Sequence, residues 1–358
     1  MRALFSVAAA GLATAFLVPP TAPVQAQSIS PESVTATMSV GETLTINKTI
    51  TLGESGANLV DIFFLADNTG SMGGVVNAAK SGAGAILGAV PGGADYNFGV
   101  GRYYGDPSEF GVSPSDAYQE LTALTDDNTA ITSGINAWNA SGGGDYPEAN
   151  FFALEQSSST VSWRTGSQRL LIWFGDAPSH TATTTEAEAI AALNATGVKA
   201  IAFNSSIDGF GLDSGNQASN VAAATDGTIT HNFNTLSGSD FATAVNGEIS
   251  AATSSLDLVF GSTLVGSGLN LTFACTDDDG CNDVGAGESR TFDLTIEAVE
   301  VGTYDFSVFA EGVSATERDL ITVVDATVPE PATLALLGTG LLAFVFLGLR
   351  RREEAESL

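Results

Sequence analysis

Between residues 59 and 251, short and largely apolar runs alternate with stretches of helical spacing. The runs are residues 60–66, 98–104, 170–174 and 198–203, and their continuous apolar character is typical of strands buried on both faces. Apolar residues at helical spacing follow, on one face of residues 75–90 (Val75, Ala79, Ala83, Ile86 and Val90) and again in residues 187–193 and 241–249. This alternation predicts an α/β fold with a doubly wound, mostly parallel sheet.

The pattern changes to period two on both sides of this block. Residues 34–52 and 256–324 alternate apolar and polar positions and are rich in Thr, Val and Phe, which predicts antiparallel strands. Two strands alone are marginal in water, so the early strands are expected to pair with the late ones. The sequence thus predicts an α/β domain at residues 58–254, inserted into an antiparallel β-sandwich made of residues 27–57 and 255–327.

Both ends of the chain have the pattern of targeting segments. Arg2 precedes an apolar segment at residues 3–18, and the small residues Val24 and Ala26 suggest cleavage after Ala26, so residues 1–26 are interpreted as a secretory signal peptide. Residues 332–349 are uncharged and are followed by three arginines at 350–352, a pattern that predicts a membrane-spanning helix with the arginines on the cytoplasmic side.

The segment before this apolar stretch contains Pro329, Glu330 and Pro331. A Val-Pro-Glu-Pro motif, a short hydrophobic helix and a basic cluster resemble, in this order, the PEP-CTERM sorting signal, here residues 328–352. The resemblance implies export to the cell envelope or extracellular matrix of a Gram-negative-type bacterium, at least transient membrane anchoring, and an exosortase as a partner.

Composition narrows the classes of partner. The chain of 358 residues carries 41 acidic and 12 basic residues, a formal net charge of −29, which repels nucleic acid and favours divalent cations or basic surfaces. Cys275 and Cys281 have five residues between them, a spacing suited to a small disulfide loop in an exported protein. Residues 277–279 are all Asp, but they do not fit an EF-hand, so a solvated acidic loop is the preferred interpretation.

Oxygen-bearing side chains follow the predicted strands. Asp67, Thr69 and Ser71 alternate directly after the first apolar run, and Asp176 follows another run. Ligands bind such sheets at the carboxyl ends of the strands, and Mg²⁺ or Mn²⁺ prefers six oxygen ligands. A divalent metal site is therefore one interpretation, and capping of the helices that follow is the alternative.

The three loops together resemble the metal-ion-dependent adhesion site of von Willebrand factor A domains, in the version found in the integrin β-subunit I-like domain, which is inserted into the hybrid β-sandwich. The carrying motifs are Asp-x-Thr-x-Ser at residues 67–71, Asp-x-Pro-Glu at residues 145–148 and Asp-Ala-x-x-His at residues 176–180. The resemblance implies that Thr69, Ser71 and Glu148 bind Mg²⁺ or Mn²⁺, while Asp67 and Asp176 hold waters or the hydroxyl ligands.

Departures from the integrin pattern change the expected number of ions. Glycines at 73 and 74 and Val75 replace the paired acids of an adjacent regulatory site, so that site is expected to be absent. A further site would use Asp106 and Asp145 together with Glu148, with Ca²⁺ as the candidate ion, although Gly143 stands where the family has Asn.

The resulting hypothesis is an exported, non-catalytic adhesion or matrix-binding protein that binds an acidic group of a protein or polysaccharide through its metal. The alternative is a structural envelope or exopolysaccharide-matrix component whose metal site is only stabilising. The chain lacks a Gly-Lys-Ser/Thr phosphate loop and a Gly-x-Ser-x-Gly elbow, and His180 is interpreted as a polar neighbour of the third loop. Hydrolysis by an activated water is therefore the weakest of the three hypotheses.

Overall fold

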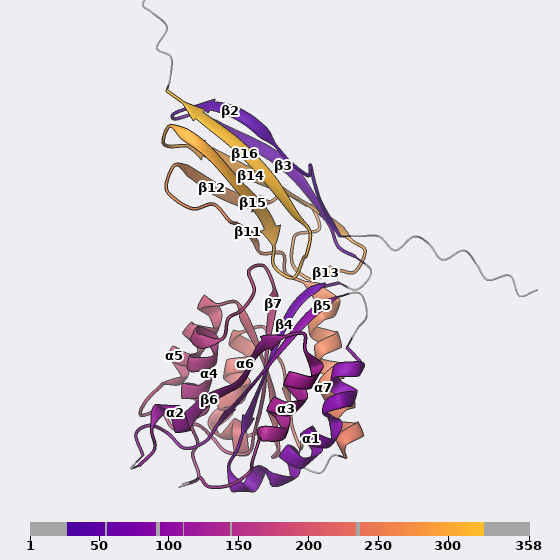
Figure 1. The fold of residues 1–358 in the computed structure, drawn as a ribbon, viewed down its shortest axis with the longest axis vertical. Coiled ribbons are helices and arrows are strands. Elements are labelled where there is room, and N and C mark those ends of the chain that lie inside the picture. The colour runs from indigo at the N-terminus through magenta and orange to yellow at the C-terminus, as the bar shows by residue number, and fades with distance from the viewer. Residues whose placement is uncertain are drawn as a thin grey trace, which may run out of the picture.

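Two bodies lie end to end in the computed structural model (Figure 1). It describes residues 27–325, apart from residues 54–55, 91–93, 110, 144 and 234–236. The predicted signal peptide and the predicted membrane helix and sorting motif at 328–352 lie outside the described residues. Within residues 27–325, none of the described helices is long and apolar enough to cross a membrane.

The first body is a sandwich of two four-stranded sheets, with strand orders β1-β3-β14-β12 and β11-β15-β16-β2. Strands from before and after the α/β body pair with each other, since β3 lies beside β14 over its whole length. The strands are β1 (Ser28–Ser30), β2 (Thr35–Ser39), β3 (Thr43–Thr51), β11 (Phe260–Ser262), β12 (Leu269–Cys275), β14 (Ser289–Ala298), β15 (Gly302–Ala310) and β16 (Thr316–Val324).

One strand of the sandwich departs from the antiparallel prediction. β2 pairs with β16 in parallel, so the prediction was wrong for this strand. The chain crosses from one sheet to the other at Gly41, where φ is +84°, and β2 is therefore not a hairpin partner of β3. It adds instead to the edge of the second sheet, where the Leu320 amide donates to the Val34 carbonyl at 2.8 Å.

The second body contains a six-stranded sheet of order β6-β5-β4-β7-β8-β9, in which only β6 runs antiparallel to its neighbour. The predicted α/β class and mostly parallel sheet are therefore confirmed. The strands are β4 (Leu59–Asp67), β5 (Asp95–Tyr103), β6 (Tyr118–Thr125), β7 (Gln168–Gly175), β8 (Val198–Asn204) and β9 (Ile229–Thr230).

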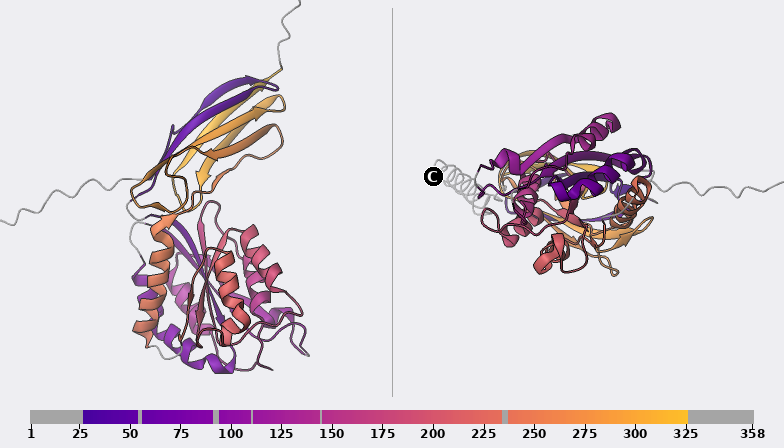
Figure 2. Two further views of the ribbon diagram at one scale, coloured as in Figure 1. Left: turned by 180° about the vertical axis from the view of Figure 1, so that it is seen from behind. Right: turned by 90° about the horizontal axis from the view of Figure 1, so that it is seen from below.

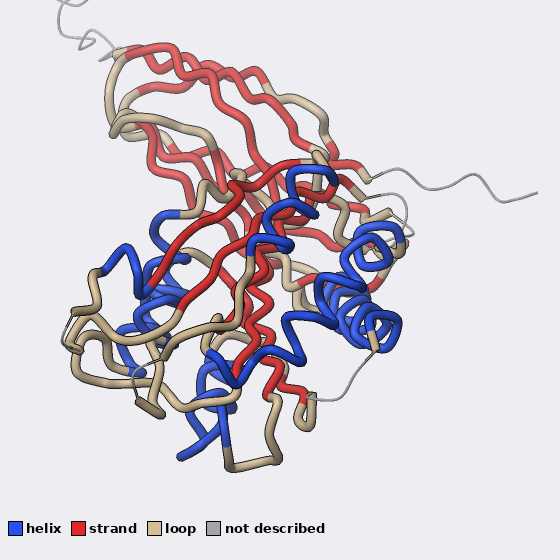
Figure 3. The backbone as a smooth tube through the Cα atoms, turned by 60° about the horizontal axis from the view of Figure 1, so that its bottom comes forward, coloured by secondary structure: helices blue, strands red, loops and turns tan. Residues whose placement is uncertain are grey.

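Helices cover both faces of this sheet (Figures 2 and 3). β4 explains this arrangement, because its side chains are apolar on both faces. Ile62 and Phe64 belong to one buried cluster, together with residues of α1, α3 and α7. Phe63 and Leu65 belong to another, together with residues of α4, α5 and α6. The helices are α1 (Gly73–Gly88), α2 (Pro114–Ala117), α3 (Asn128–Ala137), α4 (Asn150–Thr160), α5 (Glu186–Ala195), α6 (Gln217–Ala224) and α7 (Gly238–Ser254), with the 3₁₀ turns η1 (Gly70–Met72) and η2 (Gly211–Asn216).

The junction of the two bodies fixes the direction of the sheet. β4 and β7 begin beside the sandwich, and α1, which follows the end of β4, lies at the opposite end of the molecule (Figure 1). After α7 the chain returns through a small sheet of β10 (Ser255–Leu256) and β13 (Val284–Gly285). Cys275 and Cys281 form a disulfide in this region. The carboxyl ends of the parallel strands therefore face away from the sandwich.

Candidate metal centre

The first predicted loop, directly after β4, is held in place by backbone hydrogen bonds from both sides. The Asn68 amide donates to the Tyr103 carbonyl at the end of β5 at 2.8 Å, and the Ser141 amide donates to the Asn68 carbonyl at 2.9 Å. The Gly70 amide donates to the Gly142 carbonyl at 3.2 Å. The loop that leads to α4 is thus hydrogen-bonded to the first loop.

The loops that carry Glu148 and Asp176 are joined to each other in the same way. The Glu148 amide donates to the Pro178 carbonyl at 2.8 Å, and the His180 amide donates to the Glu148 carbonyl at 2.9 Å. The Asn150 side chain donates to the Ala177 carbonyl at 2.9 Å. The structure therefore brings together all three loops that the sequence motifs singled out.

Three of the predicted ligands lie close to one another. The hydroxyl oxygens of Thr69 and Ser71 are 3.3 Å apart, near the separation of about 3.0 Å expected for adjacent oxygens bound at about 2.1 Å in an octahedron. Glu148 lies beside them, because a Cβ added to Gly143 would meet the Glu148 Oε1 atom and the Thr69 Cγ2 atom, each at 3.2 Å. Gly143, with φ of +88°, leaves room for this approach.

Asp67 has an unsatisfied oxygen at the centre of the cluster. Its side chain is 0% exposed. The Oδ1 atom accepts a hydrogen bond from the Thr69 amide at 2.8 Å, but the Oδ2 atom has no partner among the described residues. A buried carboxylate oxygen without a partner costs free energy unless a cation or donor compensates it.

Helix capping, the alternative interpretation of these oxygens, is not what the structure shows. Thr69 is the N-cap of η1, Met72 of α1 and Ala149 of α4, and none of the three positions has a side-chain capping hydrogen bond. Neither Asp67 nor Glu148 occupies a cap position. These side chains therefore do not act as helix caps.

The electrostatics of the cluster favour an added positive charge. Burial, helped by the charge of Asp176, raises the pKa of Asp67 from 3.8 to about 7 against the hydrogen bonds from Thr69. Burial also raises the pKa of Glu148 from 4.5 to about 8, with the charge of Asp67 adding to it. Burial raises the pKa of Asp176, against a hydrogen bond from the Ser71 hydroxyl.

The ion pairs of the described lysines and arginines all lie elsewhere in the molecule. A divalent cation would supply the compensating charge, and hydroxyl and carboxylate oxygens are donors that Mg²⁺ and Mn²⁺ prefer. The residues present therefore fit such an ion.

The residues of the predicted second site are arranged differently from the expectation. Asp106 accepts hydrogen bonds from the Ser108 amide at 2.8 Å and from the Thr183 hydroxyl. Asp145 faces His180 instead, with the His180 Nε2 atom 3.1 Å from an Asp145 oxygen and 3.3 Å from a Glu109 oxygen. Calcium binding by Asp106 and Asp145 stays a prediction.

Several residues around the cluster were not singled out by the motifs. Glu109 joins Asp145 and His180, and nothing in its sequence context signals this. Tyr103 lies beneath the cluster, where its hydroxyl donates to the Phe174 carbonyl at 3.1 Å and accepts from the Trp173 indole at 3.0 Å. The sequence signal that could have indicated Tyr103 is its position as a polar residue at the end of a buried strand.

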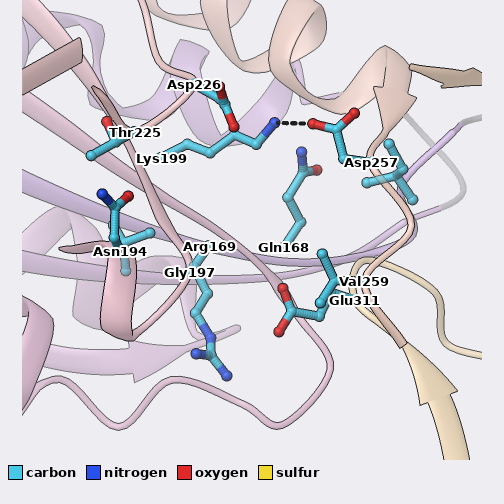
Figure 4. Close-up of a pocket in the computed structure, with 12 residues that line it drawn as sticks. Gln168, Arg169, Asn194, Gly197, Lys199, Thr225, Asp226, Asp257, Val259 and Glu311 are labelled. Carbon is cyan, nitrogen blue, oxygen red and sulfur yellow. Dashed lines mark hydrogen bonds and ion pairs between the residues drawn. The ribbon is translucent and has the colours of Figure 1, made fainter. Parts of the chain in front are cut away.

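A separate cavity of about 140 Å³ lies at the amino ends of β7 and β8, next to the sandwich (Figure 4). Lys199 and Asp257 form an ion pair of 3.4 Å there. Burial raises the pKa of Glu311, against the charge of Arg169. This cavity lies at the opposite edge of the sheet from the metal cluster and contains none of the predicted ligands.

The comparisons with known proteins concern the tail and the fold. Residues 327–352 match the PEP-CTERM protein-sorting motif, which confirms the predicted sorting signal and marks an exported protein of the cell envelope or extracellular space. The sequence matches none of the curated proteins with which it was compared.

The solved structures to which the chain is similar include a von Willebrand factor type A protein, an adhesin and a matrix protein. The first is a von Willebrand factor type A protein from Catenulispora acidiphila, with 14% identity, coverage of 85% of this chain and 76% of that chain, and a TM-score of 0.42. The second is the pilus adhesin SpaC from Lactobacillus rhamnosus GG, with 11% identity, coverage of 79% of this chain and 45% of that chain, and a TM-score of 0.38. The third is proximal thread matrix protein 1 from the mussel byssus with a zinc-occupied MIDAS motif, with 18% identity, coverage of 59% of this chain and 48% of that chain, and a TM-score of 0.42. The chain spans less than half the length of the last two. Similarities of this size say nothing about a ligand.

Proposed function

We propose that this chain is an exported adhesion or matrix-binding protein that binds an acidic group of a protein or polysaccharide through a divalent ion. Thr69, Ser71 and Glu148 would hold the ion, and Asp67 and Asp176 would position them. The observation that supports this most is the fully buried Asp67 carboxylate, whose Oδ2 atom has no partner among the described residues.

Each residue has a role that follows from its contacts. The hydroxyls of Thr69 and Ser71 are neutral ligands, so most of the ion's charge would remain available to a carboxylate of the partner. Asp67 fixes the first loop through the Thr69 amide, and Asp176 orients the Ser71 hydroxyl. The ion supplies the positive charge that recognises the acidic group.

The position of the cluster suits an adhesion site. β16 ends at the end of the sandwich that is farthest from the α/β body, whereas the metal cluster lies at the carboxyl edge of the sheet (Figure 1). A protein attached to the envelope through its C-terminal sorting segment would therefore present the cluster outwards. We propose Mg²⁺ or Mn²⁺ for the site because all of its donors are oxygens.

A structural role is the second candidate. The three loops are already joined by backbone hydrogen bonds, and an ion could simply rigidify them in an envelope or matrix component. This alternative predicts that Mg²⁺ raises the melting temperature without enabling any ligand to bind.

Binding to acidic polymers separates the two candidates. The protein would be tested on surfaces coated with alginate or poly-L-glutamate, with dextran as the uncharged control, in Mg²⁺ and in EDTA. We expect binding to an acidic polymer only in Mg²⁺, and no binding by an Asp67→Ala/Ser71→Ala variant. Equal binding in EDTA would refute recognition through the metal, and stabilisation by Mg²⁺ without binding would favour the structural role.

A further inference from the structure

A lysine is fully enclosed in the core of the β-sandwich. Lys48 lies on β3, in the first sheet, and its side chain is 0% exposed. It meets two acidic side chains of β16 in the second sheet, Glu317 and Asp319, both also 0% exposed. The three groups thus connect the two sheets of the sandwich.

The surroundings of this triad are apolar. Phe292 pairs with Lys48 across β14 and β3, and Phe306 pairs with Asp319 across β15 and β16; both rings are buried. Ions in such an environment have a desolvation cost of several kcal/mol each, on the order of the attraction between them. Two acids and one amine also leave one acid without a counter-charge, so an ordinary ion pair does not satisfy the group.

The two acidic side chains make different contacts. Asp319 accepts hydrogen bonds at both oxygens, from the Val34 amide at 2.7 Å and from the Lys48 Nζ atom at 3.4 Å. Glu317 is in contact with the same Nζ atom, yet neither of its oxygens has a hydrogen-bond partner among the described residues. Burial raises the pKa of Glu317, against the positive charge of Lys48.

This difference assigns chemical roles. An amine held in contact with a carboxyl group is close to its carbon as well, and a protonated carboxyl group is the form that can acylate such an amine. Asp319, with a backbone donor and the lysine as partners, is placed to accept a proton from Lys48. We propose that Lys48 and Glu317 condense to an amide cross-link inside the sandwich, with Asp319 as the proton carrier.

The reaction is balanced without any co-reactant. Asp319 takes a proton from the Lys48 ammonium, and the free amine attacks the carboxyl carbon of Glu317. The C–N bond forms, the C–OH bond breaks, and the hydroxyl leaves as water with a proton that Asp319 relays from the nitrogen. One amide and one water are formed, and no group is oxidised or reduced.

Preorganisation would accelerate this step, and the removal of buried charges would favour its product. Groups held in contact react as if at effective concentrations of about 10⁵–10⁸ M, and the product replaces buried ionic groups by a neutral amide. The cross-link would join β3, before the inserted α/β body, to β16 after it. It would give the sandwich a covalent connection between its two sheets, which the local Cys275–Cys281 disulfide does not provide.

Trypsin digestion of the full-length chain, followed by mass spectrometry, tests this proposal. Trypsin does not cleave after an acylated lysine, and cleavage after Arg318 separates Glu317 from Asp319. We expect cleavage after Lys48 to be blocked, and the peptide that contains Lys48 to be joined to residues 291–318 with the loss of one water. The disulfide lies within residues 200–290 and does not interfere.

Variants identify the participants. Lys48→Arg keeps the charge but should abolish the linked peptide, whereas Lys199→Arg, at the other lysine that is paired with an acid, should leave it intact. Asp319→Asn should slow formation by about 10²-fold or more, because proton transfer contributes that much. Free peptides ending at Lys48 in the wild type would overturn the proposal, and a link to residues 319–350 would overturn the assignment of Glu317.

Discussion

Replacing Asp67 by asparagine should stabilise the metal-free protein. The amide side chain retains an oxygen that can accept the hydrogen bond of the Thr69 amide, now made to the Asp67 Oδ1 atom at 2.8 Å. The substitution removes a buried charge whose Oδ2 atom has no partner among the described residues. In the absence of a cation, therefore, the variant loses an unfavourable charge in the folded state, although it also loses the carboxylate that organises the metal loop.

The size of the effect follows from the pKa of Asp67, which burial raises from 3.8 to about 7. Each unit corresponds to about 1.4 kcal/mol, so the ionised side chain lowers the free energy of unfolding by about 4 kcal/mol above pH 7. A raised pKa means that the wild type loses this stability as pH rises from about 4 to about 7. The variant should gain about 4 kcal/mol at pH 8 and about 1 kcal/mol at pH 4.5.

Asp61→Asn is the matched control, since Asp61 lies on the same strand and is also 0% exposed. Its carboxylate pairs with Arg164, at 2.6 Å between Oδ1 and Nε, and accepts from the Ser167 hydroxyl at 2.9 Å. Removing this partner should cost about 3–5 kcal/mol.

Urea unfolding in EDTA would compare both variants with the wild type. Tryptophan fluorescence reports on the α/β body, because all three tryptophans, at 138, 163 and 173, lie between β4 and α7. The two variants should shift the midpoint in opposite directions at pH 8. A loss of stability in Asp67→Asn as large as that in Asp61→Asn would refute the electrostatic reasoning.

Three further predictions concern the metal and the loops. The affinity for Mg²⁺ in calorimetric titrations should be at least about tenfold weaker at pH 6 than at pH 8. Protons compete with the ion for the carboxylates of Asp67 and Glu148, whose pKa values are about 7 and 8. An unchanged affinity would contradict this. Gly143→Ala should weaken Mg²⁺ binding and lower the melting temperature, since the added Cβ would meet Glu148 and Thr69 at 3.2 Å and φ is +88° at this position. The control is Gly84→Ala, whose Cβ would have nothing within 4 Å and which should not weaken the binding. Reduction of the Cys275–Cys281 disulfide should lower the free energy of unfolding of the sandwich by about 2 kcal/mol, as expected for so short a loop. A urea midpoint that does not change on reduction, measured by circular dichroism, would contradict this prediction.

The sequence predicted the α/β body because its hydrophobic pattern has one explanation. The continuous apolar runs at 60–66 and 170–174 become β4 and β7, buried on both faces, and the helical face that begins at Val75 becomes the buried side of α1. Only Val90 of that face lies beyond the helix, which ends at Gly88.

The direction of β2 could not be predicted in the same way. Period two fixes which side chains point inwards, but it contains no information on whether a strand runs parallel or antiparallel to a neighbour that is almost 300 residues away. The same limit applies to the buried triad, because Lys48 and Glu317 approach each other only through the packing of the two sheets.

The candidate site was partly accessible from the sequence. The motifs indicated the three loops, two of which follow β4 and β7, whereas the loop with Glu148 lies between α3 and α4. The position of Glu109 beside His180 depends on the path of the irregular loop after β5, and loops of this kind have no periodic signal.

Titration calorimetry of Mg²⁺ and Mn²⁺ into residues 27–327 would measure metal binding itself, with the Asp67→Ala/Ser71→Ala variant as control. We expect saturable binding of one ion at the cluster in the intact protein, and loss of that binding in the variant. No heat of binding in the intact protein, or the same binding in the variant, would contradict a metal site formed by Asp67, Thr69, Ser71, Glu148 and Asp176.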